Sequence, residues 1–343
     1  MKIAIHNSKQ GFHPRWIDYC KENNIEYKLV DCYSNLVIDQ LKGCSSLFWH
    51  YNHLNPKDMV IAKQILFALE HSGFKVFPNF KTAWHFDDKI GQKYLLKALN
   101  LPLVPSYVFF DQKSAFEWIR NTSFPKVFKL RKGAGSANVR LINNSKQAKK
   151  IIRHSFNKGF NLYNSWTELK ERIYKYQNGK SSTSNLLKGF ARCFYPPKFS
   201  KISGKEIGYV YFQEFIPNND SDTRIIIIDN KAFALKRMVR KGDFRASGSG
   251  EFYYERSNFD LSCVRLAFEA NKKIQSQCIA YDFIFDEDKK PLIVEISYGF
   301  SPSGYDKCPG YWDQNLQWYE TSFNPYGWMI NTLILGGESK NKI

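Results

Sequence analysis

Two short apolar runs near the C-terminus each contain one carboxylate, and this pair constrains the fold more than any other feature. The runs are Ala280–Phe285, which contains Asp282, and Pro291–Ser297, which contains Glu295. The acidic turn residues 286–288 separate them, so the pattern predicts a hairpin of two neighbouring strands. A carboxylate inside a buried strand is costly unless a cation or hydrogen-bond donors pair with it. The hairpin is therefore expected to bring Asp282 and Glu295 together beside a positive charge.

That charge has two candidate sources. Paired carboxylate oxygens suit Mg²⁺, which typically uses one or two carboxylates together with substrate phosphates. Alternatively, each carboxylate pairs with a nearby lysine or arginine, and the two residues are purely structural.

The composition favours acidic partners. The 343 residues carry a formal net charge of +18, which is typical of proteins that meet nucleic acid, anionic membranes or polyanionic substrates. The basic residues are spread along the chain, so an acidic substrate is favoured over dedicated nucleic-acid binding. No apolar stretch approaches the roughly 20 residues of a membrane span. The seven cysteines form no CxxC pair, which indicates reduced thiols in a cytoplasmic protein.

The chain divides into three expected domains of mixed α/β and α+β class. Residues 1–85 alternate strands and helices, which predicts a small parallel sheet flanked by helices. Residues 86–208 indicate an α+β lobe with an insertion at about 155–205, and residues 209–343 a strand-rich lobe with an aromatic-rich tail.

Three further segments carry polar groups where strands end. In Lys126–Val139, Lys129 ends a strand and a glycine-containing loop with Lys132 follows, an arrangement that lets backbone N–H groups approach phosphates. Gln213–Ile216 ends another strand and suits a nucleobase edge. Arg224, Lys236–Arg237 and Arg245 lie near strand ends, from which arginines clamp phosphate or carboxylate oxygens. An ordinary basic hairpin, an ordinary strand end and scattered surface charges are the alternatives.

In this order, the segments resemble the ATP-grasp superfamily, most closely its carboxylate–amine ligases of the ribosomal-protein-S6 glutamate ligase and glutathione-synthetase types. The resemblance covers about residues 75–300 and rests on DDKIGQKYLLKALNLPLVP, VFKLRKGAGSANVRLI, QEFIPNNDSDTRIIII, ALKRMVRKGDFRASGSG and YDFIF…PLIVEIS. It implies an ATP-grasp fold preceded by an N-terminal parallel-sheet domain.

The resemblance also implies roles for individual residues in ATP binding. Lysines in relatives that contact the ATP phosphates correspond to Lys89 and Lys129, and Asp222 is a candidate contact for the ribose. The loop that covers the phosphates in relatives corresponds to Lys132, Gly133, Gly135 and Ser136. The strand that meets adenine corresponds to Gln213, Glu214, Phe215 and Ile216.

Catalytic and metal-binding roles follow in the same way. Arg237 and Arg245 resemble the arginines that hold the γ-phosphate or the acyl phosphate, with Arg224 assisting. Asp282 and Glu295 resemble the magnesium ligands, for which Mn²⁺ is an alternative metal. Relatives place an asparagine two residues after the glutamate, whereas this chain has Ser297, a weaker neutral ligand that puts a second metal ion in question.

The implied reaction consumes ATP. A substrate carboxylate attacks the γ-phosphate to give an acyl phosphate and ADP, and an amine or amino acid then displaces phosphate to form an amide. The aromatic tract 298–328 resembles tails of ATP-grasp proteins of surface-polysaccharide and capsule biosynthesis, which implies a sugar-linked uronic acid as the carboxylate. Asp306, Asp313 and Glu320 in this tract are candidate contacts for the amine. Alternatively, its rings simply pack against the core.

Three other functions remain open at this stage. The chain could add amino acids to a protein or peptide, bind nucleic acid, or bind a nucleotide without catalysis. Nucleic-acid binding is disfavoured because Asp282 and Glu295 would repel a phosphate backbone in the absence of a metal ion. A homo-oligomer is compatible with all of these.

Overall fold

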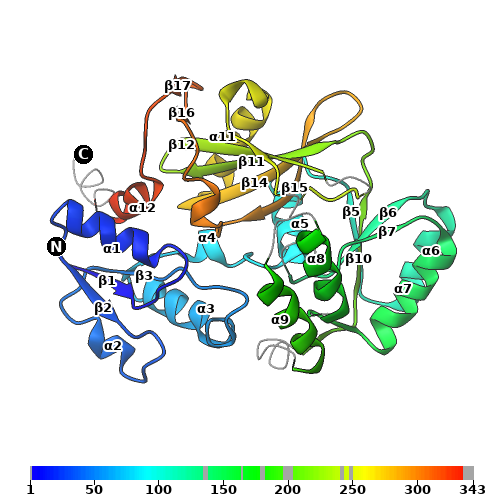
Figure 1. The fold of residues 1–343 in the computed structure, drawn as a ribbon, viewed down its shortest axis with the longest axis horizontal. Coiled ribbons are helices and arrows are strands. Elements are labelled where there is room, and N and C mark those ends of the chain that lie inside the picture. The colour runs from blue at the N-terminus through cyan, green and yellow to red at the C-terminus, as the bar shows by residue number, and fades with distance from the viewer. Residues whose placement is uncertain are drawn as a thin grey trace. The chain divides into compact units, whose positions relative to one another are not determined.

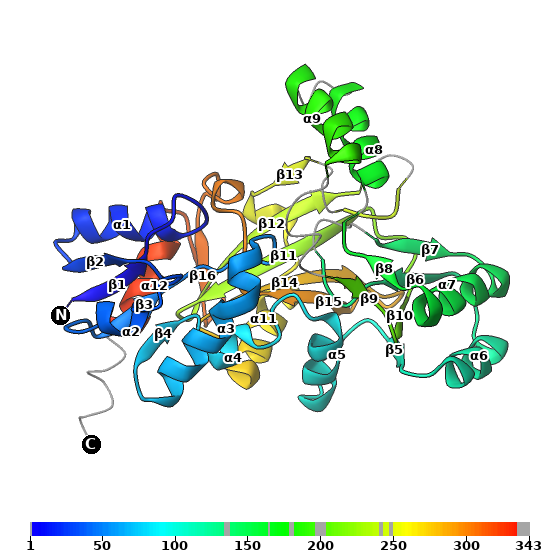
Figure 2. The ribbon, with the colours of Figure 1, turned by 90° about the horizontal axis from the view of Figure 1, so that it is seen from below.

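The computed structural model describes residues 2–133, 138–163, 165–177, 182–195, 204–239, 243–246 and 250–334. The chain forms two compact units (Figures 1 and 2). Unit 1 comprises residues 1–86, 91–104 and 216–343, and unit 2 comprises residues 87–90 and 105–215.

Unit 1 begins with a parallel sheet of order β2-β1-β3-β4, so the predicted N-terminal parallel sheet is confirmed. Its strands are β1 (Ile3–His6), β2 (Tyr27–Val30), β3 (Ser46–Phe48) and β4 (Lys75–Phe77), and its helices are α1 (His13–Glu22), α2 (Val37–Gln40), α3 (Pro56–His71) and α4 (Phe80–Ala83). Helix α3 begins where the Asn55 side chain accepts a hydrogen bond from the Lys57 amide and Pro56 fits the first turn.

The second sheet of unit 1 has the order β15-β14-β11-β12-β16-β17, with β13 also paired to β12. Its strands are β11 (Ser221–Ile228), β12 (Lys231–Met238), β13 (Phe252–Tyr253), β14 (Cys278–Phe285), β15 (Pro291–Ser297), β16 (Tyr311–Asp313) and β17 (Trp318–Tyr319). Helices α11 (Leu261–Ile274) and α12 (Pro325–Ile334) belong to the same unit, and α5 (Lys89–Ala98) begins in unit 2 and continues into unit 1.

Alternation along these strands separates two cores on opposite faces of the sheet. Ile225, Ile227 and Ala234 pack with α11 in what we call the α11-side core. Ile226 and Phe233, which adjoin them in the sequence, pack on the other face in the α12-side core. Figure 1 shows α11 on one face of the sheet and α12 beside α1.

The α12-side core explains why the two ends of the chain form one unit. It contains Ile3 and Trp16 from the N-terminal domain together with Phe233, Phe300 and Met329. The sequence analysis placed residues 1–85 and 209–343 in separate domains. In the structure they fall in one unit, because residues more than 200 positions apart share this core.

Unit 2 contains an antiparallel sheet of order β5-β10-β6-β7, a short pair β8-β9 and four helices that lie wholly within its described part. Its strands are β5 (Ser106–Phe109), β6 (Lys126–Lys129), β7 (Arg140–Ile142), β8 (Phe160–Asn161), β9 (Lys205–Glu206) and β10 (Val210–Glu214), and its helices are α6 (Gln112–Asn121), α7 (Ser145–Asn157), α8 (Ser165–Gln177) and α9 (Thr183–Phe194). Helices α6 and α7 pack against the sheet around Phe128 and Phe212. The expected insertion holds α8 and α9, side by side in both views.

The shared core generates a prediction about stability. Phe300 is 6% exposed and its ring lies 4.7 Å from Phe12, 5.1 Å from Tyr305 and 5.9 Å from Phe233, measured between centroids. Phe300→Ala should lower the free energy of unfolding by about 3–5 kcal/mol. Urea denaturation measures this change, and Phe110→Ala, at a side chain that is 60% exposed, is the matched control. Hydrogen exchange of β1 that stays unchanged in Phe300→Ala would contradict a single shared core.

Candidate functional site

Four charged side chains, of which Arg237 and Asp282 are buried and Asp222 and Arg224 mostly buried, form a cluster on the α12-side face of the second sheet of unit 1. We call Asp222, Arg224, Arg237 and Asp282 the ion-pair cluster. Asp222 lies opposite Arg237 in the β11–β12 register, and Arg224 lies opposite Asp282 in the β11–β14 register. They share one face because they take the same alternate positions as Ile226, Phe233 and Ala280.

The geometry of the cluster is bidentate. Arg224 donates from Nε to Asp282 Oδ1 at 2.5 Å and from Nη2 to Asp282 Oδ2 at 2.6 Å. Arg237 donates from Nε and Nη2 to the two oxygens of Asp222, each at 2.6 Å. Its Nη2 also lies 2.9 Å from Asp282 Oδ2, so Asp282 is shared by both arginines. Such paired contacts fix orientation as well as charge.

The two carboxylates of the cluster differ in acidity. Burial acts to raise the pKa of Asp282, but Arg224 and Arg237 outweigh it and hold that pKa well below its ordinary value. Burial raises the pKa of Asp222, and the charge of Asp282 adds to this effect against the pull of Arg237. Asp282 is therefore the carboxylate that stays ionised most firmly.

Tyr305 lies beside this cluster and was missed by the sequence analysis. Its ring is 7% exposed and packs against Phe233 and Phe300. Burial raises the pKa of its hydroxyl to about 12, although Arg224 and Arg237 act in the opposite direction. Tyr305 belongs to the aromatic tract, where its position next to the arginines carries no local signal.

A β-bulge turns Glu295 to the same face as Asp282. Asp282 pairs with Glu295 but Phe283 pairs with Ile293, so Val294 is an extra residue in β15. As a result Ile293 and Ile296 both enter the α11-side core, and Glu295 lies on the other face. The hairpin expected from the sequence has formed, with Asp282 and Glu295 as direct neighbours.

Ser297 lies two residues beyond Glu295 on the same strand. Its hydroxyl donates to the Gly299 carbonyl at 2.9 Å and accepts from the Gly299 amide at 3.2 Å. The only hydroxyl hydrogen is therefore committed to this turn, and a lone pair remains for another contact. The role of Ser297 as a metal ligand stays a prediction.

Unit 2 holds a second group of the expected residues, on β6 and β10. Lys129 donates to Gln213 Oε1 at 2.6 Å, and both side chains are buried. Glu214 accepts from Lys126 at 2.7 Å and from the Tyr107 hydroxyl at 3.0 Å. The β6–β10 pairing thus brings together residues expected to contact phosphate and adenine. Phe215 and Ile216 follow directly after β10.

Lys89 and the turn after β6 are also joined within unit 2. Lys89 donates from Nζ to the Gly133 carbonyl at 2.8 Å, and the Gly133 amide donates to Asp87 Oδ1 at 2.7 Å. Gly133 has a φ of +107°, which favours glycine. Lys132 precedes it, whereas Gly135 and Ser136 lie outside the described residues. The sequence analysis missed Asp87, whose contact depends on tertiary structure.

The remaining candidates have local or structural partners. Arg245 donates from Nη2 to Asp243 Oδ2 at 2.6 Å. Asp306 forms an ion pair with Arg15 at 2.6 Å, and Asp313 accepts from the amides of Asn315 and Gln317 within a turn. Their roles toward a substrate stay predictions.

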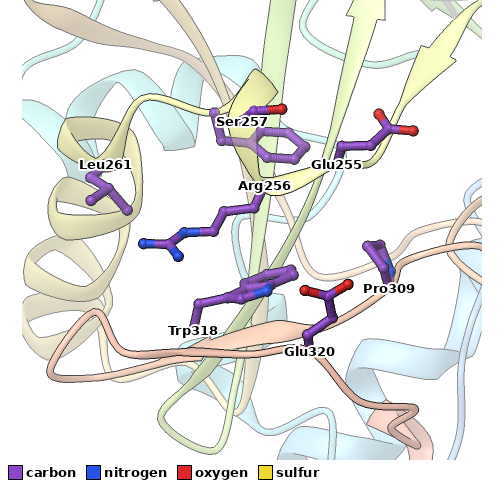
Figure 3. A pocket seen from close by; sticks show the side chains of 8 residues that line it. Glu255, Arg256, Ser257, Leu261, Pro309, Trp318 and Glu320 are labelled. Atoms are coloured by element: carbon purple, nitrogen blue, oxygen red, sulfur yellow. The ribbon is translucent and has the colours of Figure 1, made fainter.

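Glu320 lines an open pocket of about 620 Å³ in unit 1. Figure 3 shows Arg256 and Trp318 projecting into one space, with Glu255 and Glu320 on the side away from Leu261. Phe259 and Trp318 also pack against the α11-side core. The pocket therefore opens on the sheet face opposite the ion-pair cluster, and we do not assign it to the same reaction.

The buried charges of the cluster generate a testable expectation. Asp282→Asn should lower the free energy of unfolding at pH 7 by about 3–5 kcal/mol, because two buried arginines lose their shared counter-charge. Below the ordinary carboxyl pKa of 3.8, the unfolded wild-type chain takes up a proton that folded Asp282 does not, so this contribution shrinks as the pH falls.

Urea unfolding at several pH values measures the difference between the two proteins. Asp288→Asn is the matched control, because that side chain is 75% exposed at the tip of the same hairpin. A stability difference between wild type and Asp282→Asn that stays constant down to pH 3 would contradict the strongly lowered pKa.

Part of the chain is similar to a known protein family. Residues 200–308 match the RimK-like ATP-grasp domain, the part of the chain that contains the ion-pair cluster and Glu295. None of the curated proteins matches the chain.

Solved structures resemble the chain over nearly its whole length. A RimK domain ATP-grasp protein from Sphaerobacter thermophilus is 14% identical with a TM-score of 0.53, over 98% of this chain and all of that one. D-cycloserine synthetase DcsG is 13% identical with a TM-score of 0.58, over 98% and 99% of the two chains. The ATP-grasp ligase PsnB, solved with a minimal precursor, Mg and ADP, is 13% identical with a TM-score of 0.54, over 97% of each chain. The chain therefore has the ATP-grasp fold, and its assignment to the ATP-grasp superfamily is supported.

Proposed function

We propose that this protein is an ADP-forming ligase that joins a carboxylate to an amine through an acyl-phosphate intermediate. The observation that carries the proposal is the ion-pair cluster with Glu295 beside it in register. Two arginines and two adjacent carboxylates, fixed on one sheet face, are the groups that a phosphoryl transfer from ATP requires.

The carboxylate pair fits Mg²⁺ that arrives with a nucleotide. Asp282 and Glu295 offer only oxygen ligands, and the bulge at Val294 turns both to one face. Among the described residues, no group of three or more His, Cys, Asp or Glu side chains could hold a metal ion by itself. Two carboxylates plus phosphate oxygens and water satisfy Mg²⁺, which seldom uses all-protein cages. ATP and Mg²⁺ are the cofactors that the ATP-grasp relatives support.

Mg²⁺ bound there would neutralise phosphate charge and orient the transferring group. Arg224 and Arg237 contribute the other positive charges. Both are bidentate donors held by buried carboxylates, so their side chains need little ordering when a phosphate binds. Arg245 is proposed to join them at the γ-phosphate or acyl phosphate.

The lysines of unit 2 are proposed to contact the phosphates. Lys129 is buried, and its ammonium group is oriented by Gln213. The Lys89 ammonium group is held at the Gly133 carbonyl, next to the turn expected to cover the nucleotide. Glu214 and Phe215 at the end of β10 are proposed to meet the adenine edge, and Asp222 the ribose.

The reaction itself needs no nucleophilic side chain. The substrate carboxylate oxygen attacks the γ-phosphorus, the bond to the β-phosphate oxygen breaks, and ADP leaves. The amine nitrogen then attacks the acyl carbon, loses a proton, and expels inorganic phosphate. The protein contributes position and charge neutralisation at both steps.

A uronic acid linked to a sugar polymer or its precursor is the carboxylate that we propose. The net charge of +18 favours an acidic substrate. Phe300 and Trp312 of the aromatic tract are buried in the cores, but Trp318 and Tyr319 are at least partly exposed and offer rings with polar tips of the kind that contact sugars. A protein or peptide carboxylate is the second candidate, since the same basic surface would attract an acidic chain. A non-catalytic nucleotide-binding role is the third.

Substitution of Glu295 tests the mechanism. Glu295→Gln keeps the size of the side chain but removes the charge proposed to hold Mg²⁺, so the rate of ADP release should fall by more than about 100-fold. Glu287→Gln, an exposed residue in the turn of the same hairpin, is the matched control and should retain wild-type activity. Equal ADP release by the two variants would rule out the proposed metal site.

A substrate panel tests the reaction class. ADP release with Mg²⁺ and ATP is measured for uronic acids, uronic-acid glycans and acidic peptides, each crossed with amino acids. We expect release only when a carboxylate and an amine are both present, and fastest with the uronic-acid acceptors. Faster release with the peptides would favour the second candidate. Nucleotide binding without turnover for any pair would favour the third.

A further inference from the structure

Helix α9 exposes an apolar stripe that its own unit leaves uncovered. Leu187 is 68% exposed, Phe190 48% and Phe194 80%, and the adjoining Tyr195 is 82% exposed. The spacings of three and four residues place Leu187, Phe190 and Phe194 on one side of the helix. With the neighbouring Trp166, which is 69% exposed, we call these five residues the α9 apolar face.

The helix that carries the α9 apolar face packs against α8. Gly189, on the other side of α9, is buried, and a Cβ there would lie 2.6 Å from Arg172 Cδ and 3.2 Å from Leu169 Cδ1 of α8. The Ser165 hydroxyl donates to the Arg192 carbonyl at 3.1 Å, which brings the start of α8, and with it Trp166, to the last turn of α9. The two helices therefore pack on each other and leave Trp166, Phe190 and Phe194 exposed.

This part of the chain is strongly basic, although α8 contains Glu168 and Glu171, and Glu168 pairs with Arg172 and Arg192. Between residues 172 and 205 there is no aspartate or glutamate, whereas the basic residues are Arg172, Lys175, Lys180, Lys188, Arg192, Lys198, Lys201 and Lys205. Lys188 is exposed and directly follows Leu187 on α9. An apolar helix face rich in aromatic residues, set in a basic segment, is the pattern of helices that lie in a membrane interface.

We propose that the α9 apolar face binds the surface of an anionic membrane. Its aromatic and leucine side chains would enter the boundary between head groups and acyl chains, and Lys188, exposed on the same helix in a segment of basic sequence, would meet the lipid phosphates. The proposal concerns peripheral binding only, since none of the helices in the described ranges is long and apolar enough to cross a bilayer.

Other occupants fit less well. A second copy of the chain, packed face to face, would bring two segments of net positive charge together and repel itself. A nucleic acid or acidic polysaccharide would be attracted by the charge, and single-stranded bases stack on aromatic rings. Neither, however, gives a role to Leu187 or to a continuous apolar stripe along one side of a helix. An anionic lipid surface satisfies both the apolar face and the charge.

Vesicle co-sedimentation of the full chain tests the proposal. We expect at least tenfold tighter binding to vesicles of phosphatidylcholine with 30% phosphatidylglycerol than to pure phosphatidylcholine, with binding weakened by added salt. The double variant Phe190→Ser/Phe194→Ser should lose at least tenfold of this binding. Leu36→Ser/Ile38→Ser, at side chains that are 59% and 58% exposed, is the matched control and should bind like wild type.

Several other results would contradict membrane binding by the α9 apolar face. Vesicle binding that is absent, equal for the two lipid mixtures, or equal for both double variants overturns the proposal. So does a dimer in analytical ultracentrifugation, or oligonucleotide binding, that disappears in Phe190→Ser/Phe194→Ser while vesicle binding persists. Leu187→Gln serves as a second, milder variant if circular dichroism shows that the double variant has lost helix content. Nucleotide-dependent activity in solution should be the same in all of them, which separates this test from the proposed ligase reaction.

Discussion

The bidentate contact between Arg224 and Asp282 is the interaction on which the rest of the site depends. Four charged side chains are largely withdrawn from solvent on one sheet face, which would be costly for any one of them without a partner. Two arginines balance two aspartates, with Asp282 shared between both arginines. The cluster is therefore electrically neutral as a set and compatible with the packing of Phe233 and Phe300 nearby.

This neutrality has a consequence for the proposed chemistry. The phosphates of ATP bring several negative charges, so a neutral cluster alone would not attract them. With Asp282 and Glu295 holding Mg²⁺, the charges of Arg224 and Arg237 would be less fully matched and would be available to phosphate. The carboxylate of Asp282 would thus hold the arginines before the nucleotide arrives and the metal ion afterwards. Glu295, brought to the same face by the bulge at Val294, supplies the additional charge that this exchange requires.

The sequence predicted the parts of this site that depend on neighbouring residues. The hairpin of Asp282 and Glu295 was predictable because a turn of a few residues joins two regular strands. The pairing of Arg224 with Asp282 was not, because it spans 58 residues and requires β14 to add beside β11. Helix α9 was missed for a local reason. It begins with Ser, Thr and Asn and contains Gly189, residues of low helix propensity, so the helical spacing of Leu187, Phe190 and Phe194 was not recognised. The core shared by residues 1–86 and 216–343 could not be predicted, because neither segment alone shows which apolar residues of the other it contacts.

The charged residues of the chain therefore fall into two groups, the matched charges of the ion-pair cluster and the unmatched basic residues elsewhere. The ion-pair cluster, which contains the candidate catalytic arginines, has no net charge, so the formal value of +18 must arise elsewhere. The longest run without an acidic residue is 118–167, and a second such run lies at residues 172–205, around α9. A basic composition thus says little about the chemistry of the buried site, where each charge is matched, and more about the surfaces that bring the protein to an acidic partner. Attraction of an acidic partner requires unmatched charge exposed to solvent, whereas the proposed catalysis requires matched and oriented charge. In this chain, different residues therefore meet the two requirements.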